Sequence, residues 1–288
     1  MIQPVVLALL LLPLVAAQDP VAEGARVRKL AGGFKFLEGP AADKKGHVFF
    51  SDIPNNRIHR WSLAGKLTTF QERSGGANGL YFDSKGRLLA CQGKARRVAR
   101  YTRNGKQTVL VAAFGNKPLN SPNDLWIGPD QSVWFTDPRY GGMDDLEQGG
   151  FHVYWLPHDG SALRRVIDDL VKPNGIVGSM DGKHLYVADP GAGKIWRYRI
   201  AAPGRLADKT LFVADAGSDG MTVDLHGNLY LTWRGAVRIH AKDGRLVRSI
   251  KIPEGPANVA FGGAEFKTLF ITARTGLYAL DMAVAGRK

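Results

Sequence analysis

The feature that most restricts the fold of this chain is a sequence pattern that recurs six times. In each repeat a polar residue is followed by a short apolar strand, a turn and a second apolar strand. The repeats are about 45 residues long, the length of a four-stranded propeller blade. Their opening segments are Glu38-Gly-Pro-Ala-Ala-Asp43, Asn78-Gly-Leu-Tyr-Phe-Asp83, Asn123-Asp-Leu-Trp-Ile-Gly128, Asn174-Gly-Ile-Val-Gly-Ser179, Asp219-Gly-Met-Thr-Val-Asp224 and Asn258-Val-Ala-Phe-Gly-Gly263.

A turn is expected eight residues after each opening residue. Glycine, which tolerates positive φ, stands there in four of the six repeats. We therefore predict an all-β protein, a six-bladed β-propeller with four-stranded blades. The sixth repeat ends after its third strand, near 276–280, and residues 26–30 resemble an unpaired outer strand, so joining the two would close the ring. One domain over residues 22–288 follows from this pattern.

The first 17 residues resemble a secretory signal peptide. They form an uncharged apolar segment that ends on the small residues Ala16 and Ala17, and it is too short to span a bilayer. The usual Lys or Arg before the apolar core is absent, so a buried strand is the alternative interpretation. We expect export, to the periplasm or outside the cell, and no membrane span elsewhere in the chain.

The net charge of +13 raises the question of a nucleic-acid partner. Lys and Arg are spread over every repeat instead of gathering on one element with stacking aromatic residues, so we expect no nucleic-acid binding. Cys91 is the one cysteine, which excludes an intrachain disulfide and a cysteine-based zinc site. We expect it to be a small buried residue at a strand end. The sequence does not predict the oligomeric state.

The opening residues occupy the same position in every repeat. In a propeller the first strand of each blade lines the central channel. Six polar residues should therefore surround one mouth: Glu38, Asn78, Asn123, Asn174, Asp219 and Asn258. For Asn78 and Asn258 the expected role is contact with substrate, and a turn or capping role is the alternative.

The other four residues of this ring predict a metal site. Two carboxylates and two amide oxygens in a channel are costly unless a cation pairs with them. An oxygen-only set with two negative charges, Glu38, Asn123, Asn174 and Asp219, suits Ca²⁺, although another divalent cation is an alternative. Four protein ligands would leave positions open for water and substrate.

Such a site could polarise a substrate carbonyl, and a carboxylate beside it could take a proton from water or attack directly. We choose Asp219 over Glu38 for that catalytic role. Asp52, Asp137 and Asp189, which end second strands, are expected to cap loops, with metal support as an alternative. The long connection 138–150 is predicted to be a lid or specificity loop, and its Arg139 and Tyr140 are expected to contact substrate.

The mature chain resembles the gluconolactonase/regucalcin (senescence marker protein) family of calcium-dependent six-bladed propellers. The resemblance rests on Leu37-Glu38-Gly39-Pro40, Ser121-Pro122-Asn123-Asp124, Pro173-Asn174-Gly175-Ile176 and Ser218-Asp219-Gly220-Met221, which stand where that family has its four metal ligands. It implies a small-molecule lactone as substrate and Asp219 as general base or nucleophile. Regucalcin-like members have an Arg where this chain has Ser121, which leaves sugar-lactone specificity open.

Three functions therefore remain in view. The leading one is calcium-dependent lactone hydrolysis of the gluconolactonase type. A related hydrolase for phosphotriesters or other esters is the second. The third is a non-catalytic propeller that binds a ligand and uses calcium for stability alone, because a fold does not fix a function.

Overall fold

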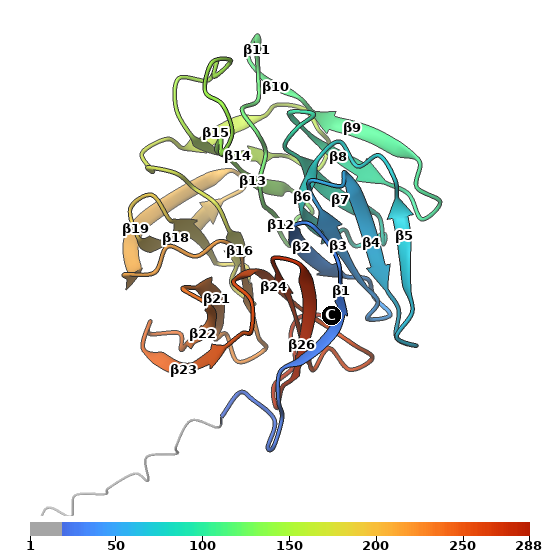
Figure 1. Cartoon of the computed structure of the whole chain (residues 1–288). Coiled ribbons are helices and arrows are strands. Elements are labelled where there is room, and N and C mark those ends of the chain that lie inside the picture. The colour runs from blue at the N-terminus through green and yellow to red at the C-terminus, as the bar shows by residue number, and fades with distance from the viewer. Residues whose placement is uncertain (1–18) are drawn as a thin grey trace, which may run out of the picture.

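The computed structural model describes residues 19–288, which form strands and no helix. Six four-stranded antiparallel sheets surround a central axis, and a two-stranded hairpin, β10 (Ala113–Phe114) with β11 (Lys117–Pro118), projects beyond them (Figure 1). The predicted six-bladed propeller is confirmed. The predicted signal peptide, residues 1–17, lies outside the described residues and stays a prediction. No helix among residues 19–288 is long and apolar enough to cross a membrane.

Each blade is a sheet whose four strands run in order from the channel to the surface. Blades 1 to 3 are β2 (Leu37–Ala42), β3 (Val48–Asp52), β4 (Arg57–Trp61), β5 (Leu67–Gln71); β6 (Ala77–Phe82), β7 (Leu88–Gln92), β8 (Arg97–Tyr101), β9 (Gln107–Val111); and β12 (Leu125–Ile127), β13 (Val133–Asp137), β14 (His152–Leu156), β15 (Arg164–Ile167). Blades 4 to 6 are β16 (Ile176–Gly178), β17 (His184–Asp189), β18 (Lys194–Ala202), β19 (Arg205–Ala214); β20 (Met221–Val223), β21 (Leu229–Trp233), β22 (Ala236–His240), β23 (Leu246–Lys251); and β24 (Pro256–Gly262), β25 (Thr268–Ala273), β26 (Gly276–Asp281), β1 (Arg28–Gly32).

The predicted turns join the first two strands of every blade. All six residues at the expected offset have positive φ, including Gln131 at 63° and Phe266 at 57°, where the sequence has no glycine. An L residue in this region is strained unless its surroundings hold it there. The side chain of Phe266 is buried, and the Phe266 carbonyl accepts a hydrogen bond from the Gly286 amide, so local packing fixes this turn.

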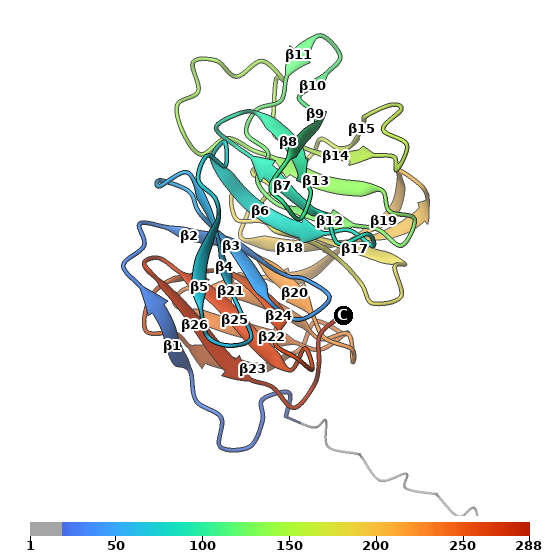
Figure 2. The same ribbon diagram turned by 90° about the vertical axis from the view of Figure 1, so that its right-hand side faces the viewer.

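The ring closes with strands from both ends of the described chain. β1 pairs antiparallel with β26, Arg28 facing Ala279 and Gly32 facing Gly276, as the sequence predicts (Figure 2). Every innermost strand also contacts the innermost strands of the two neighbouring blades, from β2 through β6, β12, β16, β20 and β24 back to β2. The six sheets therefore form a closed ring of neighbouring inner strands.

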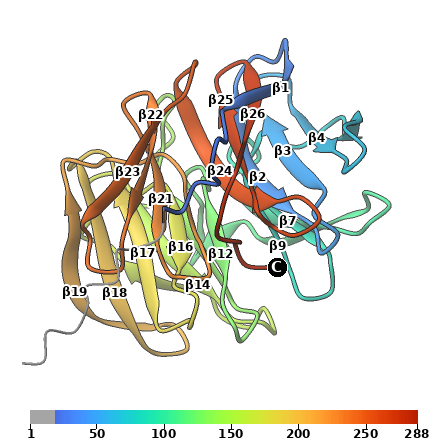
Figure 3. The same cartoon turned by 90° about the horizontal axis from the view of Figure 1, so that it is seen from below.

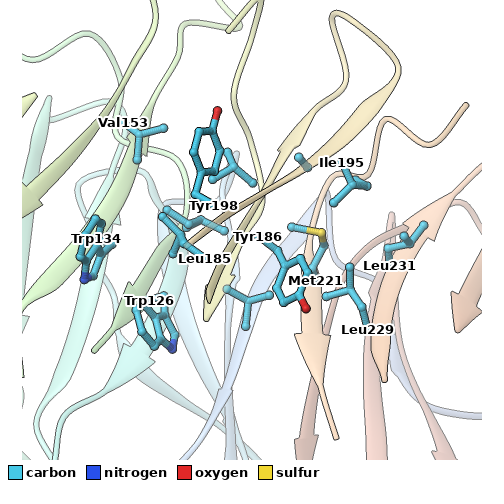
Figure 4. Close-up of a cluster of buried hydrophobic side chains, with 14 of the residues drawn as sticks. Trp126, Trp134, Val153, Leu185, Tyr186, Ile195, Tyr198, Met221, Leu229 and Leu231 are labelled. Carbon is cyan, nitrogen blue, oxygen red and sulfur yellow. The ribbon is translucent and has the colours of Figure 1, made fainter. Parts of the chain in front are cut away.

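Apolar side chains pack between adjacent blades and hold the ring together. The largest cluster lies between blades 3, 4 and 5, where Trp126 and Trp134 pack near Leu185 and Met221 (Figure 4). Strands become more exposed with distance from the axis: β3 is buried throughout, whereas β5 has no fully buried residue. Cys91 in β7 is a free buried residue, which confirms its predicted place in the core.

Candidate functional site

The six predicted ring residues lie at corresponding places, at or just before the start of each inner strand. Glu38, Asn78 and Asn258 lie within β2, β6 and β24, while Asn123, Asn174 and Asp219 lie two residues before β12, β16 and β20. Hydrogen bonds between neighbouring blades hold the ring residues at one height along the channel. The Gly79 amide donates to the Asn123 carbonyl (2.7 Å) and the Gly220 amide to the Ala257 carbonyl (2.8 Å). The positions of all six residues are thus set by the ring itself.

The glycines that follow several ring residues allow neighbouring blades to approach closely. A Cβ on Gly175 would lie 2.4 Å from the Asp219 carbonyl oxygen, and one on Gly39 would lie 2.0 Å from the Asn78 carbonyl oxygen. Gly79 and Gly175 do not have positive φ. The Asn-Gly pairs are therefore not turns, although a turn at Asn78 was one interpretation of the sequence.

Hydroxyl groups from the second strands support the ring backbone. Ser51 donates to the Asn78 carbonyl (2.7 Å), Thr136 to the Asn174 carbonyl (2.7 Å), Thr232 to the Ala257 carbonyl (2.8 Å) and Thr272 to the Asn258 carbonyl (3.2 Å). The hydroxyls of Ser51, Thr136 and Thr232 each bond a residue of the next blade. The hydroxyl of Thr272 bonds a residue of its own blade, blade 6. These bonds restrict the direction in which the ring side chains project.

Two carboxyls face each other in the ring. Glu38 is 3% exposed, and its Oε2 accepts a hydrogen bond from the Gly39 amide (3.1 Å). Burial and the negative charge of Asp219 raise the pKa of Glu38 well above its usual range. Burial raises the pKa of Asp219 to about 6, while hydrogen bonds from Asn174 and Glu38 oppose that rise. The two carboxyls therefore titrate as a coupled pair, and the pair holds a proton to higher pH than an isolated carboxyl would.

Asn174 joins this carboxyl pair to the loop above it. Its Nδ2 donates to Asp219 Oδ1 (2.7 Å) and to the Tyr140 hydroxyl oxygen (2.8 Å). An ionised carboxylate accepts and does not donate, so this contact identifies the nitrogen end of the amide. Asn123 is also buried, and its side chain forms no hydrogen bond within residues 19–288.

Asp124 is a third acid at this level that the sequence analysis did not assign. It is 7% exposed, and burial, with a smaller contribution from Asp219, raises its pKa to about 7. A hydrogen bond from the Asn258 amide stabilises the ionised forms of both Asp124 and Glu38. The signal in the sequence was Asp124 itself, a carboxylate directly after a ring residue where four of the six repeats have glycine.

The aspartates at the ends of second strands cap loops, as predicted. Asp52 accepts from the Phe36 amide (3.2 Å), Asp137 from the amides of Asn120 (2.8 Å) and Ser121 (2.7 Å), and Asp189 from the amides of Val171 (3.1 Å) and Lys172 (2.8 Å). In this way they hold the loops that lead into the inner strands.

The structure separates the roles of Arg139 and Tyr140. The Tyr140 hydroxyl lies in the ring, near Asp219 and Glu38, whose charges add to burial in raising its pKa. The Arg139 guanidinium instead contacts protein groups of the surrounding loops: the Asn120 carbonyl (2.8 Å), the Gly142 carbonyl (3.2 Å) and Asp145 (2.5 Å). Arg139 thus anchors the loop, and Tyr140 is the member of the pair that reaches the ring.

The ring side chains fit a hard divalent cation. Carboxylates and amides supply oxygen donors, and the charged groups that shift the pKa values of Glu38 and Asp219 include other acids and no Lys or Arg. Buried acids without a cationic neighbour are the arrangement that a Ca²⁺ ion would neutralise. No group of three His, Cys, Asp or Glu side chains suited to a metal occurs within residues 19–288, so the amides are needed to complete the set.

Below the ring the inner strands enclose a cavity of about 350 Å³. Asp124 and Asn258 border it toward the ring, and apolar side chains such as Leu80, Trp126 and Met221 line its walls. The tail after β26 runs beneath the inner strands toward β12 and brings Arg287 and Lys288 to the lower end of the cavity (Figure 3).

Comparisons with known proteins agree with this architecture. Residues 36–275 match the SMP-30/gluconolactonase/LRE-like region. A gluconolactonase from Zymomonas mobilis is 30% identical over 280 residues, covering 86% of this chain and 78% of its own length. A gluconolactonase structure from Xanthomonas campestris has a TM-score of 0.84 at 31% identity, covering 93% of this chain and 96% of that one.

A more distant structure shares the fold. Regucalcin from Agrobacterium tumefaciens, described as a calcium-binding protein, has a TM-score of 0.79 at 22% identity and covers 93% of this chain and 96% of its own. The repeat, the ring and these likenesses lead to one conclusion: this chain belongs to the SMP-30/gluconolactonase/LRE-like family.

Proposed function

We propose that this protein hydrolyses lactones, with a divalent cation, Ca²⁺ by its donor set, held by Glu38, Asn123, Asn174 and Asp219. The observation that carries the proposal is the pair of facing carboxyls, Glu38 and Asp219, whose pKa values are raised and which form no ion pair with Lys or Arg within residues 19–288. The gluconolactonases from Zymomonas mobilis and Xanthomonas campestris support lactones as the substrate class.

The chemistry assigns separate tasks to these residues. A bound cation would polarise the ester carbonyl of the substrate. Asp219 is partly exposed, unlike the other three proposed ligands, Glu38, Asn123 and Asn174, so it is suited to accept a proton from the attacking water. The water oxygen bonds to the carbonyl carbon, the ring C–O bond breaks, and the proton passes to the leaving alkoxide. The product is a hydroxy acid. Direct attack by the Asp219 carboxylate on the carbonyl carbon would release the ring alkoxide and form a mixed anhydride, which water would then hydrolyse to the same hydroxy acid.

The test combines binding with turnover. Calorimetry with Ca²⁺ and acid release from D-glucono-1,5-lactone and a panel of smaller and alkyl-substituted lactones would be measured for the wild type and Asp219→Asn. We expect Ca²⁺ binding, hydrolysis that chelation abolishes, and a loss of activity of about 1000-fold or more in Asp219→Asn. Calcium binding without turnover of any lactone, carboxylic ester or phosphotriester would instead favour a ligand-binding propeller. Turnover of a phosphotriester alone would favour the related hydrolase.

A further inference from the structure

The connection from β13 to β14 holds a tyrosine against one of the four proposed cation ligands. Tyr140 receives a hydrogen bond from Asn174 Nδ2 (2.8 Å), and the second hydrogen of that nitrogen goes to Asp219 (2.7 Å). With both hydrogens engaged, the orientation of the Asn174 amide is fixed, and its Oδ1 forms no hydrogen bond within the described part of the chain. Lys172 lies 4.3 Å from the centroid of the Tyr140 ring and adds a cation–π contact from the loop before β16.

The same connection is anchored at its far side by an ionic bridge. Asp145 accepts hydrogen bonds from Arg139 (2.5 Å) and from Arg96 (2.9 Å), which belongs to the neighbouring blade 2. Both guanidiniums are also tied to backbone, Arg96 to the Leu119 carbonyl (2.5 Å) and Arg139 to the Asn120 carbonyl (2.8 Å). Their side chains are 20% and 13% exposed, against 59% for Asp145. Asp145 therefore pairs with Arg96 of blade 2 and with Arg139 of its own connection, and both arginines are tied to backbone carbonyls before β12. Glu147 of the same connection adds a longer ion pair to Arg96 (3.6 Å).

We propose that Tyr140 is a positioning residue for Asn174, and that the bridge from Asp145 to Arg96 and Arg139 holds Tyr140 in that place. This inference rests on the proposed function, because Asn174 matters through the cation. Tyr140 touches the amide and acts on the cation site through it. Within residues 19–288 no hydrogen bond or ion pair joins Asp145 to a ring residue, so Asp145 acts by fixing the connection that carries Tyr140. Supporting groups of this kind typically change metal affinity by about 10-fold or more.

The experiment compares Tyr140→Phe, Asp145→Asn and the double variant with the wild type. Asp144→Asn is the matched control, since Asp144 is an exposed acid next to Asp145 that forms no ion pair within residues 19–288. Calcium affinity by calorimetry is the first readout, and kcat and KM for one small lactone are the second. Tyr140→Phe keeps the ring and the cation–π contact and removes only the hydroxyl.

We expect Tyr140→Phe to weaken Ca²⁺ binding by about 10-fold and Asp145→Asn by about 3-fold, with kcat falling at saturating Ca²⁺ and KM little changed. Because Asp145 acts through Tyr140, the double variant should bind Ca²⁺ no more weakly than Tyr140→Phe. Equal affinity in the wild type and Tyr140→Phe would overturn the positioning role, and additive losses in the double variant would overturn the role of the bridge. A wild type that binds no divalent cation would overturn the proposed function as well.

Discussion

The two ends of the central channel are built by the same six inner strands and differ in chemistry. At the upper end the strands present Glu38, Asp219 and four amides, with Asp124 directly behind them. At the lower end they present apolar side chains, and the nearby charges are the cations Lys44, Arg287 and Lys288, with Asp83 paired to Arg87. The repeat therefore sets where a side chain lies, whereas the individual residue in each blade sets what the channel can bind there.

The contrast also explains why the carboxyls at the upper end have raised pKa values. A buried carboxylate is stable when a hydrogen-bond donor or a cation compensates it. The upper end supplies amide donors from Gly39, Asn174 and Asn258, which stabilise the carboxyls only in part, so their pKa values stay raised. The lower cations do not appear among the groups that shift the pKa of Glu38 or Asp219. The upper end is thus an acidic site whose negative charge a bound cation would neutralise.

The largest expected effect on cation affinity comes from removing one charge at the upper end. Glu38→Gln keeps the shape of the side chain, and we expect it to weaken Ca²⁺ binding by about 100-fold, because affinity at oxygen sites depends on the number of charged ligands. The chelated variant should be at least as stable as the chelated wild type, since a buried ionisable group is gone. Calorimetry and thermal melting in EDTA test both statements. Glu265→Gln, an exposed acid in the β24–β25 turn, is the control and should change neither.

A methyl group added beside the ring residues should lower both the stability of the fold and the affinity of the site for Ca²⁺. In Gly175→Ala the new Cβ would lie 2.4 Å from the Asp219 carbonyl oxygen, which is backbone and cannot move aside cheaply. We expect a loss of about 3 kcal/mol in the free energy of unfolding, with weaker Ca²⁺ binding as blades 4 and 5 separate. Gly142→Ala is the control, because nothing lies within 4 Å of a Cβ there. A Gly175→Ala protein of wild-type stability would show that the ring tolerates a wider blade spacing.

The raised pKa values at the upper end predict how pH affects the cation-free protein. Burial raises the pKa of Asp124 to about 7 and that of Asp219 to about 6, from 3.8. Between about pH 4 and pH 7 the folded protein therefore holds more protons than the unfolded chain, and its stability falls as pH rises through that window. We expect the melting temperature in EDTA to drop by about 5 °C from pH 5 to pH 7.5.

Calcium should reverse that dependence, because cation binding requires ionised carboxylates and strengthens as pH rises. The measurement is thermal melting at both pH values with EDTA and with saturating Ca²⁺. Asp124→Asn, which cannot ionise at this position, should remove the part of the drop in EDTA that Asp124 contributes, while the raised pKa values of Glu38, Asp137 and Asp219 account for the rest. A melting temperature that rises with pH in EDTA, for the wild type and Asp124→Asn alike, would contradict the assignment of the upper end as an uncompensated acidic site.

The sequence predicted the parts of this site that depend on the repeat. The shared phase placed Asn174 and Asp219 in one ring, and the fixed offset predicted the turn even at Phe266, where the residue type argued against it. Contacts between blades depend on distances that no repeat encodes. The hydrogen bond from Asn174 to Tyr140 and the docking of Asp145 on Arg96 join segments of different blades, so their partners became evident only in the folded ring.

The smallest expected effect concerns the lower end. Arg287 is near enough to Tyr81 to lower the pKa of its hydroxyl, yet it is not among the groups that shift the pKa of Asp124. We therefore expect Arg287→Ala to change the Ca²⁺ dissociation constant and kcat/KM by less than about 2-fold, within the range of surface substitutions. Calorimetry at low and at moderate salt checks this, because a long-range charge effect would grow as salt is removed. A tighter dissociation constant in Arg287→Ala that returns to the wild-type value in salt would mean that the lower cations oppose cation binding across the cavity, and the two ends would then act as one electrostatic unit.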